Sequence, residues 1–521
     1  MFKTLFFPVV LLIALGIRLW NYTAIALWHD EAFSALLIRL PFAEMMHRIA
    51  LDVHPPFYYW LLRIWSGAFG HSLSSLRGFS VLFGILTVAM LYLLVKSLTQ
   101  NKKAAIVSTL LLAVNPFHIQ YSLEARMYTL GTFLVGVSSW VIIRAIQTNK
   151  WRWWLLFALL TTASALTHYF LLFSIAAQGL FIFIWWFKTF GRDIFYRRLS
   201  SARHMWRWLG AYILSVILYL PWLPTFWKQF NQVQESYWIP KMDIWSIPMT
   251  LWKILIGGWQ GSSELWLVAA SIIVLILLVL YVSKYRGLLS WYIVFLGVVP
   301  FILAVLISLK TALFLDRYFI FASVFLVAII ALALLSLKSR IAYVLIGLTV
   351  IASLTSYYIG WQRLNIDQKP GMKAASAAIF ENYPNDCTQT GEIADSKVVV
   401  SSTFIYFSYQ YYDKLNKDLI REANSLILCP LPPEPKLYLK GIHKTSDLPH
   451  FSGTALLDDD DFVGDLNNFA GRDEQVFMLW TTGFGGNKPE TPLNWQEVSE
   501  QKFPDVFAHR GDIFVTKYLV R

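Results

Sequence analysis

Two adjacent carboxylates follow the first apolar run of this chain. The segment WHDEAFS contains Asp30 and Glu31, close to where a membrane surface would lie. An ionised acid near hydrocarbon costs free energy, roughly 2.5 to 3.5 kcal/mol at mid-bilayer and less at the interface. A positive charge or hydrogen-bond donors should therefore offset the cost of placing these two carboxylates there. A charged flank of a membrane span and a chemical role are equally well supported by this segment alone.

A histidine follows on the same loop as these acids. In LDVHPPFYYW, Pro55 and Pro56 stiffen the backbone, and His54 places an imidazole near Asp30 and Glu31 in the sequence. A rigid kink between two short helices explains these residues as well as a role for the imidazole does.

Further acids, cations and rings gather at the ends of other apolar runs. They are Glu124, Arg126, Tyr128, His168, Arg317 and Tyr318. Arginines can hold and neutralise a phosphate leaving group, while a carboxylate removes the proton from an attacking hydroxyl. A phosphate attached to a lipid would lie at this depth, with its long tail in apolar grooves between helices.

The elements that must position these residues are membrane helices. The chain has 521 residues, of which 57% are hydrophobic and 15% charged, and its mean hydropathy is +0.52. A soluble globular protein would not expose such a surface. A segment in lipid must pair its own backbone groups, and the apolar runs are too long for barrel strands, so they predict helices.

Apolar runs of roughly 17 to 25 residues predict about eleven spans. They lie near 2–20, 78–95, 104–118, 127–146, 153–168, 169–187, 208–227, 265–283, 287–309, 318–337 and 341–361. The loop 21–76 contains no run that could cross a membrane. Within it, the helical spacing of Met45, Met46 and Ile49 and the apolar stretch 57–69 predict two interfacial helices along the membrane.

The basic residues predict the orientation of the spans. With the N-terminus in the cytoplasm, the cytoplasmic segments hold many Lys and Arg residues but a single acid, Asp193. The positive-inside rule favours this orientation, which makes Asp30 and Glu31 extracytoplasmic in a multi-pass plasma or inner membrane protein. The pI near 9.4 follows from these topology signals and from contacts with anionic lipids, so it does not indicate a nucleic-acid partner.

The composition changes to mixed polar sequence after residue 361. We predict a transmembrane domain at 1–361 and a soluble extracytoplasmic domain at 362–521. A helix-like GMKAASAAIFENY and a strand-like KVVVSSTFIYFSY indicate that this second domain is a small α/β fold. The only cysteines, Cys387 and Cys429, fall there, and a disulfide and two separate thiols are equally well supported.

The sequence resembles the GT-C-type glycosyltransferases, and within them the family 39 group of protein O-mannosyltransferase and aminoarabinose-transferase relatives. The matching segments follow the family's order. They are DEA at 30–32, HPPFYYW at 54–60, SLRGFSVLFG at 75–84, YSLEARMY at 121–128, THYF at 167–170, YWIP at 237–240 and DRY at 316–318.

The resemblance implies an inverting transferase that moves sugar from a polyprenyl-phosphate-linked donor to a glycan, lipid or protein acceptor on the outer face. It implies that Asp30 is the general base and that Glu31 positions the acceptor or a cation. Arg126 and Arg317 become phosphate-binding candidates. The other candidates for substrate binding are His54, Glu124, Tyr128, His168 and Tyr318. Metal dependence is left open, because some relatives use a divalent cation and others do not.

A transporter or lipid-linked-sugar flippase is the main alternative. Coupled transporters usually place ionisable groups or broken helices near mid-membrane. In this sequence, the charged residues cluster at the ends of the predicted spans, which favours the transferase.

Overall fold

The computed structural model describes two compact units of the chain. Described are all residues except 1, 21, 191–198, 236–238, 258–262, 365–370, 382–395, 424–432, 484–485 and 505–510. The bundle unit comprises Met1–Tyr22, Val53–Trp65 and Arg77–Arg363, and the sheet unit comprises Thr23–Asp52, Ser66–Leu76 and Leu364–Arg521. Both cysteines and part of the YWIP segment lie outside the described residues.

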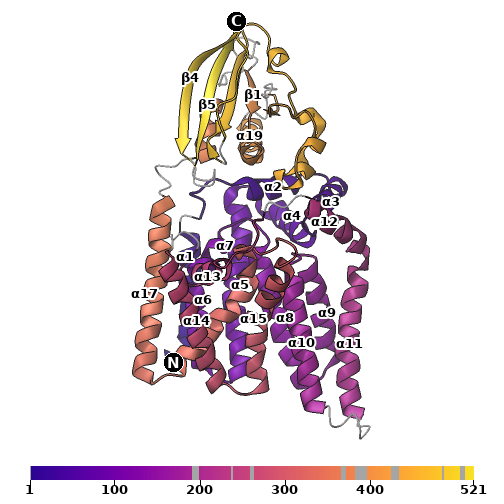
Figure 1. The fold of residues 1–521 in the computed structure, drawn as a ribbon, viewed down its shortest axis with the longest axis vertical. Coiled ribbons are helices and arrows are strands. Elements are labelled where there is room, and N and C mark those ends of the chain that lie inside the picture. The colour runs from indigo at the N-terminus through magenta and orange to yellow at the C-terminus, as the bar shows by residue number, and fades with distance from the viewer. Residues whose placement is uncertain are drawn as a thin grey trace. The chain divides into compact units, whose positions relative to one another are not determined.

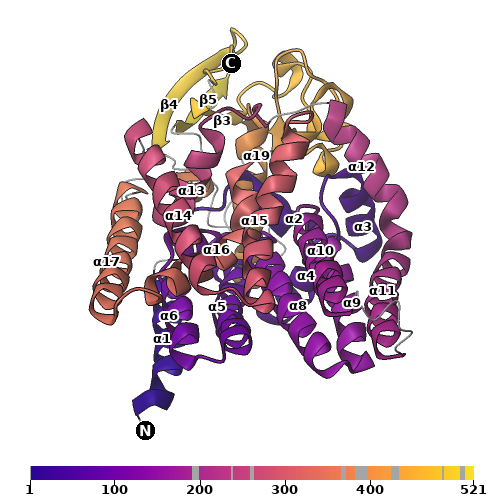
Figure 2. The ribbon, with the colours of Figure 1, turned by 60° about the horizontal axis from the view of Figure 1, so that its bottom comes forward.

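The bundle unit consists of packed helices (Figure 1). Those lying wholly or mostly in it are α1 (Phe2–Leu19), α4 (Phe57–Phe69), α5 (Leu73–Thr99), α6 (Lys102–Ala113), α7 (Pro116–Ser122), α8 (Tyr128–Thr148), α9 (Trp151–Ala165), α10 (Leu171–Phe190), α11 (Leu199–Tyr219), α12 (Leu223–Glu235), α13 (Ser246–Ile256), α14 (Glu264–Lys284), α15 (Leu288–Ser308), α16 (Ile320–Leu335) and α17 (Ser339–Leu364). Short 3-10 segments, η2 (Leu220–Trp222) and η3 (Asp316–Phe319), precede α12 and α16. Helices α8 to α11 lie side by side in both ribbon views (Figures 1 and 2).

Helix α16 forms much of the core of the bundle unit. Its sequence IFASVFLVAIIALALL has no polar face, and Ile320 to Leu334 are all buried. A helix that is apolar all round is stable only when other helices or lipid cover it. Helix α16 packs against α6, α8, α14 and α15, so the turn that leads into it, η3, is held close to these helices.

The predicted spans are mainly helical in the described residues, with breaks such as the one at 114–115, and the helical polytopic class is confirmed. Among the described residues, eight helices are long and apolar enough to cross a membrane, or nine if the bent pair α6–α7 is one span. This is fewer than the eleven predicted. Helix α9 has 15 residues, about 22 Å at 1.5 Å per residue, whereas the hydrocarbon core is about 30 Å thick. In α1, the apolar stretch Phe6–Leu19 is likewise too short to count among the eight.

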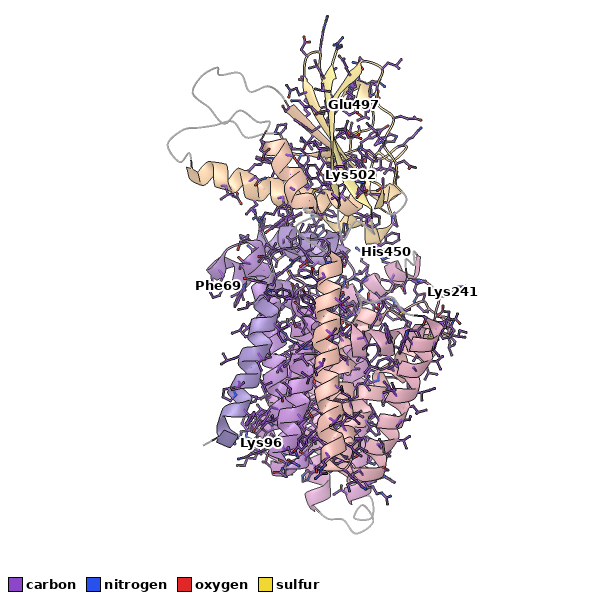
Figure 3. The ribbon with its side chains drawn as sticks, turned by 90° about the vertical axis from the view of Figure 1, so that its left-hand side faces the viewer. Phe69, Lys96, Lys241, His450, Glu497 and Lys502 are labelled. Carbon is purple, nitrogen blue, oxygen red and sulfur yellow. The ribbon has the colours of Figure 1, made fainter. Side chains whose placement is uncertain are left out.

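Loops predicted to be cytoplasmic and loops predicted to be on the outer side can be compared at the two ends of the bundle. Figure 3 shows Lys96, near the end of α5, and Lys241, in the segment before α13, at opposite ends of the helices. The sequence predicts Lys96 to be cytoplasmic and Lys241 to be on the outer side. The separation of the two lysines agrees with their placement on opposite sides, and which side is cytoplasmic stays a prediction.

The sheet unit contains a five-stranded mixed sheet. Its strands are β1 (Ser396–Val400), β2 (Lys436–Leu437), β3 (Gln475–Thr481), β4 (Trp495–Pro504) and β5 (Asp512–Val520), in the order β2-β1-β3-β5-β4. Strand β1 is parallel to β2 and β3, while β5 is antiparallel to β3 and β4. Strand β4, which contains Glu497 and Lys502, lies at one edge (Figure 3). Its charged, exposed side chains protect that edge from pairing with another chain.

Helices from both ends of the chain belong to the sheet unit. They are α2 (His29–Leu37), α3 (Phe42–Leu51), α18 (Gly371–Phe380) and α19 (Thr403–Ala423), with 3-10 turns η5 (Thr445–Asp447), η6 (His450–Ser452), η7 (Thr454–Leu456), η8 (Asp459–Asp461) and η9 (Leu466–Asn468). The two helices predicted in loop 21–76 are present as α3 and α4. By contacts, residues 23–52 and 66–76 group with the C-terminal part of the chain rather than with the bundle.

One predicted strand is corrected by the structure. Residues 397–409 were expected to form a single strand, but β1 ends at Val400 and α19 begins at Thr403. The aromatic residues misled the prediction, because Tyr406 and Tyr409 are buried at helical rather than alternating spacing. Ser401 and Ser402 separate the two elements.

Candidate active site

The predicted site residues lie in both units. Asp30 and Glu31 belong to the sheet unit, and the seven substrate-binding candidates belong to the bundle unit. Each group is described by itself. The seven are His54, Glu124, Arg126, Tyr128, His168, Arg317 and Tyr318.

The acidic pair occupies the first turn of α2. A helix N-terminus presents free backbone N–H groups and a partial positive charge, which stabilise carboxylates there. Glu31 is fully buried, and one carboxylate oxygen accepts a long hydrogen bond from the backbone N–H of Trp28 at 3.5 Å. Asp30 is half-buried, so its carboxylate is the more accessible of the two. The two acids therefore have different environments, although they are neighbours in the chain.

In the bundle unit, Arg126 lies against His54. The Nη2 atom of Arg126 is 3.3 Å from Nε2 of His54, and Arg126 is buried, with only 3% exposed. Because a guanidinium can only donate, Nε2 of His54 is the acceptor in this contact. The proton of a neutral His54 ring is then on Nδ1.

The position of Arg126 follows from a break in the preceding helix. Helix α6 ends at Ala113, and α7 starts at Pro116 after a bend of 62°. Proline cannot continue the hydrogen-bond pattern of α6, and it restricts Asn115 to extended backbone. The Asn115 side chain then caps α7 by accepting from the N–H of His118 at 2.9 Å.

Glu124 and Arg126 lie in the short turn between α7 and α8. The backbone N–H of Arg126 donates to the carbonyl of Glu124 at 2.8 Å. Tyr128 begins α8 directly afterwards, and its ring is 5.1 Å from the ring of Tyr121 in α7. This tight turn places an acid, a cation and a phenol close together.

Several rings surround His168, in the turn between α9 and α10, and Phe170 of the same turn is one of them. The ring centroid of His168 is 6.0 Å from that of His54, 6.2 Å from Tyr128, 5.0 Å from Tyr318 and 5.3 Å from Phe321. The structure thus brings together residues from four separate segments that the sequence identified independently.

His168 is held neutral by its surroundings. Burial lowers the pKa of its imidazole well below 6.5, and the positive charges of Arg126 and Arg317 and the nearby His54 add to this effect. The backbone N–H of Phe170 donates to Nδ1 of His168 at 3.1 Å. The neutral ring therefore has its proton on Nε2, which makes that atom a hydrogen-bond donor.

The sequence interpretation missed Lys253. Its Nζ lies 2.5 Å from the Asp316 carboxylate, and both side chains are only about a quarter exposed (27% and 21%). This ion pair links α13 to η3. The ammonium of Lys253 compensates the negative charge of Asp316, the residue before Arg317. No local signal marks Lys253, because it is a lysine in an apolar helix 63 positions from its partner.

The sequence interpretation also left out the contacts of Arg18. This arginine is fully buried, and it donates to the carbonyls of Ala14 and Ala113 at 3.1 and 2.9 Å. Its Nε is 3.2 Å from Ser122 Oγ, and Nη2 is 2.8 Å from Nδ1 of His118. Arg18 thus joins α1 to both halves of the bent pair α6–α7.

Within the described residues, no group of three or more His, Cys, Asp or Glu side chains is arranged to hold a metal ion. Two acids of the run 458–461 in the sheet unit have protein side chains or backbone groups as partners. Asp458 pairs with Arg48 at 2.8 Å, and Asp459 accepts from Thr445. Metal dependence, which the sequence left open, stays open.

Comparison with known proteins identifies the fold class first. The chain has the fold of the GT-C-type glycosyltransferases, as the sequence resemblance predicted. ArnT from Cupriavidus metallidurans bound to undecaprenyl phosphate superposes with a TM-score of 0.59 at 14% identity, covering 98% of this chain and 97% of that chain. Its apo structure gives a TM-score of 0.59 at 13% identity, with the same coverage.

The comparisons also give a family match for part of the chain. The family model described as dolichyl-phosphate-mannose-protein mannosyltransferase matches residues 53–224, which include His54, Arg126 and His168. The oligosaccharyltransferase AglB from Archaeoglobus fulgidus, in complex with an inhibitory peptide and a dolichol-phosphate, has a TM-score of 0.50 at 12% identity. That match covers 79% of this chain and 63% of AglB. No curated protein matches in sequence.

Proposed function

We propose that the protein is a membrane glycosyltransferase that moves a sugar from a polyprenyl-phosphate-linked donor to an acceptor hydroxyl on the extracytoplasmic face, with inversion. The observation that supports this most is the cluster of buried Arg126 and His168 with half-buried His54. A buried guanidinium beside two imidazoles offers a strong, oriented site for a phosphate. The relatives in the same fold include one bound to undecaprenyl phosphate.

In the proposed reaction, Asp30 takes the proton from the acceptor hydroxyl. The hydroxyl oxygen then forms a bond to the anomeric carbon from the face opposite the phosphate. The bond between that carbon and the phosphate oxygen breaks, and its electron pair leaves with the polyprenyl phosphate. Arg126 and Arg317 neutralise the charge that develops on this leaving group.

The other candidates bind and orient the substrates. Glu31 positions the acceptor or a cation, and Glu124 lies next to Arg126 in the α7–α8 turn. His54 and His168 orient the phosphate, since each ring has a defined donor and acceptor side. Tyr128 and Tyr318 pack against His168 and supply hydroxyl groups.

A transfer assay tests this proposal. Purified protein in liposomes would receive radiolabelled polyprenyl-phosphate hexose, pentose or amino-sugar together with glycan, lipid or hydroxyl-peptide acceptors. We expect Asp30→Asn to slow transfer by about 10²-fold or more, because general base catalysis typically contributes this much. Asp460→Asn, an exposed acid of the same unit, is the matched control and should keep the full rate.

The outcomes separate the two classes of protein. Full transfer by Asp30→Asn would remove Asp30 as the base. If wild-type protein transfers no sugar from any donor but moves a fluorescent lipid-linked sugar between leaflets, the flippase is the function. Inversion is read from the anomeric configuration of the product.

A further inference from the structure

Helix α19 of the sheet unit contacts the helix that contains the acidic pair. Two residues of the segment before Asp30, Leu27 and His29, form hydrogen bonds with α19. The backbone N–H of Leu27 donates to the Tyr412 hydroxyl at 3.0 Å. Nδ1 of His29 lies 3.2 Å from the carbonyl oxygen of Thr403. The N-terminal end of α2 is therefore fixed to α19 by hydrogen bonds from both sides of Trp28.

Aromatic packing strengthens the same contact. The ring of His29 is 5.2 Å from that of Phe407 and 5.7 Å from that of Phe404. Phe33, one turn along α2, meets Phe407 edge-on at 6.0 Å. Phe407 is completely buried, so α2 and α19 share one continuous apolar contact.

An ion pair fixes the other end of α2. Arg39 Nη1 lies 2.9 Å from a carboxylate oxygen of Asp418, with the two side chains 16% and 44% exposed. Contacts thus occur before, along and after α2. They join residues that are more than 370 positions apart in the chain.

Helix α2 needs such support because it is short. It has nine residues, and isolated helices of fewer than about 12 residues are marginal in water. The direction of the Asp30 carboxylate depends on the position of this helix. A general base must lie within hydrogen-bond reach of its proton, so a small displacement of α2 would lower the rate.

We propose that α19 is a positioning element for the acidic pair, with Tyr412, Arg39 and Asp418 as positioning residues. The C-terminal part of the chain would then be required for catalysis itself, and not only for the choice of acceptor. This inference rests on the proposed transferase function for its effect on rate. Its structural half, that α19 holds α2, can be measured without any activity.

A charge exchange tests the ion pair. Arg39→Asp and Asp418→Arg each place like charges opposite each other, and the double variant restores the pair with reversed polarity. We expect each single variant to lower kcat about tenfold with little change in KM for the donor, and the double variant to recover most of kcat. Tyr412→Phe, which leaves the Leu27 N–H without its acceptor, should lower kcat similarly.

Hydrogen exchange of the α2 amides gives the second measurement. The single variants should exchange residues 30–37 about tenfold faster than wild type, and the double variant should restore protection. Lys440→Glu is the control, because Lys440 and Glu490 form an ion pair in the same unit that is 79% and 85% exposed. This control should leave both kcat and exchange unchanged.

Two results would overturn the proposal. One is unchanged α2 exchange in Arg39→Asp, Asp418→Arg and Tyr412→Phe. The other is a double variant that stays as impaired as the singles while Lys440→Glu is equally impaired. Failure of the transferase proposal would give a different result. Wild-type protein would then transfer no sugar, while hydrogen exchange would still report the α2–α19 contact.

Discussion

Arg126 and His54 meet at 3.3 Å although they are 72 positions apart in the chain. This contact joins the α7–α8 turn to the segment before α4. We predict that Arg126→Gln lowers the transfer rate by about 10²-fold or more, since one preorganised donor to a developing negative charge is typically worth that much. Arg126→Lys should recover only part of the rate, because an ammonium lacks the planar fork.

Initial rates at saturating and limiting donor check this prediction. His54→Gln serves as the comparison, since it removes the imidazole but keeps a polar group beside Arg126. A rate for Arg126→Gln within about threefold of wild type would contradict a role in phosphate stabilisation.

The Lys253–Asp316 pair gives a second prediction. Lys253→Met leaves the Asp316 carboxylate without its partner at 2.5 Å, next to Arg317. We expect lower stability and weaker phosphate binding, because the Asp316 carboxylate would then compete with the donor phosphate for Arg317. A double-mutant cycle with Asp316→Asn, measured by thermal unfolding in detergent, should give a coupling free energy of about 1–3 kcal/mol. Strictly additive effects would show that the two side chains do not interact.

His168 predicts a pH dependence of stability. Burial and nearby charges lower the pKa of its imidazole well below 6.5 in the folded protein. The unfolded chain therefore binds a proton more readily, and the free energy of unfolding falls as the pH drops below 6.5. Above 6.5, His168 is neutral in both states and contributes no slope.

Thermal unfolding of wild type and His168→Gln from pH 5 to 8 measures this effect. The variant should lose stability less steeply below pH 6.5 than wild type. Identical slopes for the two proteins would mean that His168 is not the group responsible.

Arg18 gives a prediction about the bundle. Arg18→Met leaves the Ala113 carbonyl, Ser122 and His118 without their buried partner, so we expect a loss of about 3 kcal/mol in the free energy of unfolding. Leu12→Ala, on the same helix but 66% exposed, should cost much less and serves as control. Equal melting temperatures for Arg18→Met and wild type would refute the structural role.

Gly453 tests the packing beneath Phe407. It has φ +79°, and a Cβ atom there would lie 2.2 Å from Cε2 of Phe407. Gly453→Ala should therefore cost both backbone strain and displacement of this ring, about 1–3 kcal/mol or more. Gly441 has the same φ with nothing within 4 Å, so Gly441→Ala isolates the backbone cost. Similar melting temperatures for the two variants would show that Phe407 moves freely.

Much of the architecture could be predicted from local patterns. The length of the apolar runs identified a helical membrane protein, and helical spacing placed α3 and α4 correctly. Both features depend on residues close together in the chain, because hydrophobic periodicity follows from the helix repeat itself. The candidates His54, Arg126 and His168 came from side-chain chemistry and from motifs within single segments, and their roles stay predictions.

Only the tertiary structure decided how these segments meet. It showed that residues 403–409 are helical, since packing of Tyr406 and Tyr409 overrides the strand preference of aromatic residues. It paired Lys253 with Asp316, and it placed α19 against α2. Such contacts join positions tens to hundreds of residues apart, and they depend on shape and burial that no local pattern contains. The sequence by itself determined which residues could do chemistry, whereas the packing of helices decided which of them lie together.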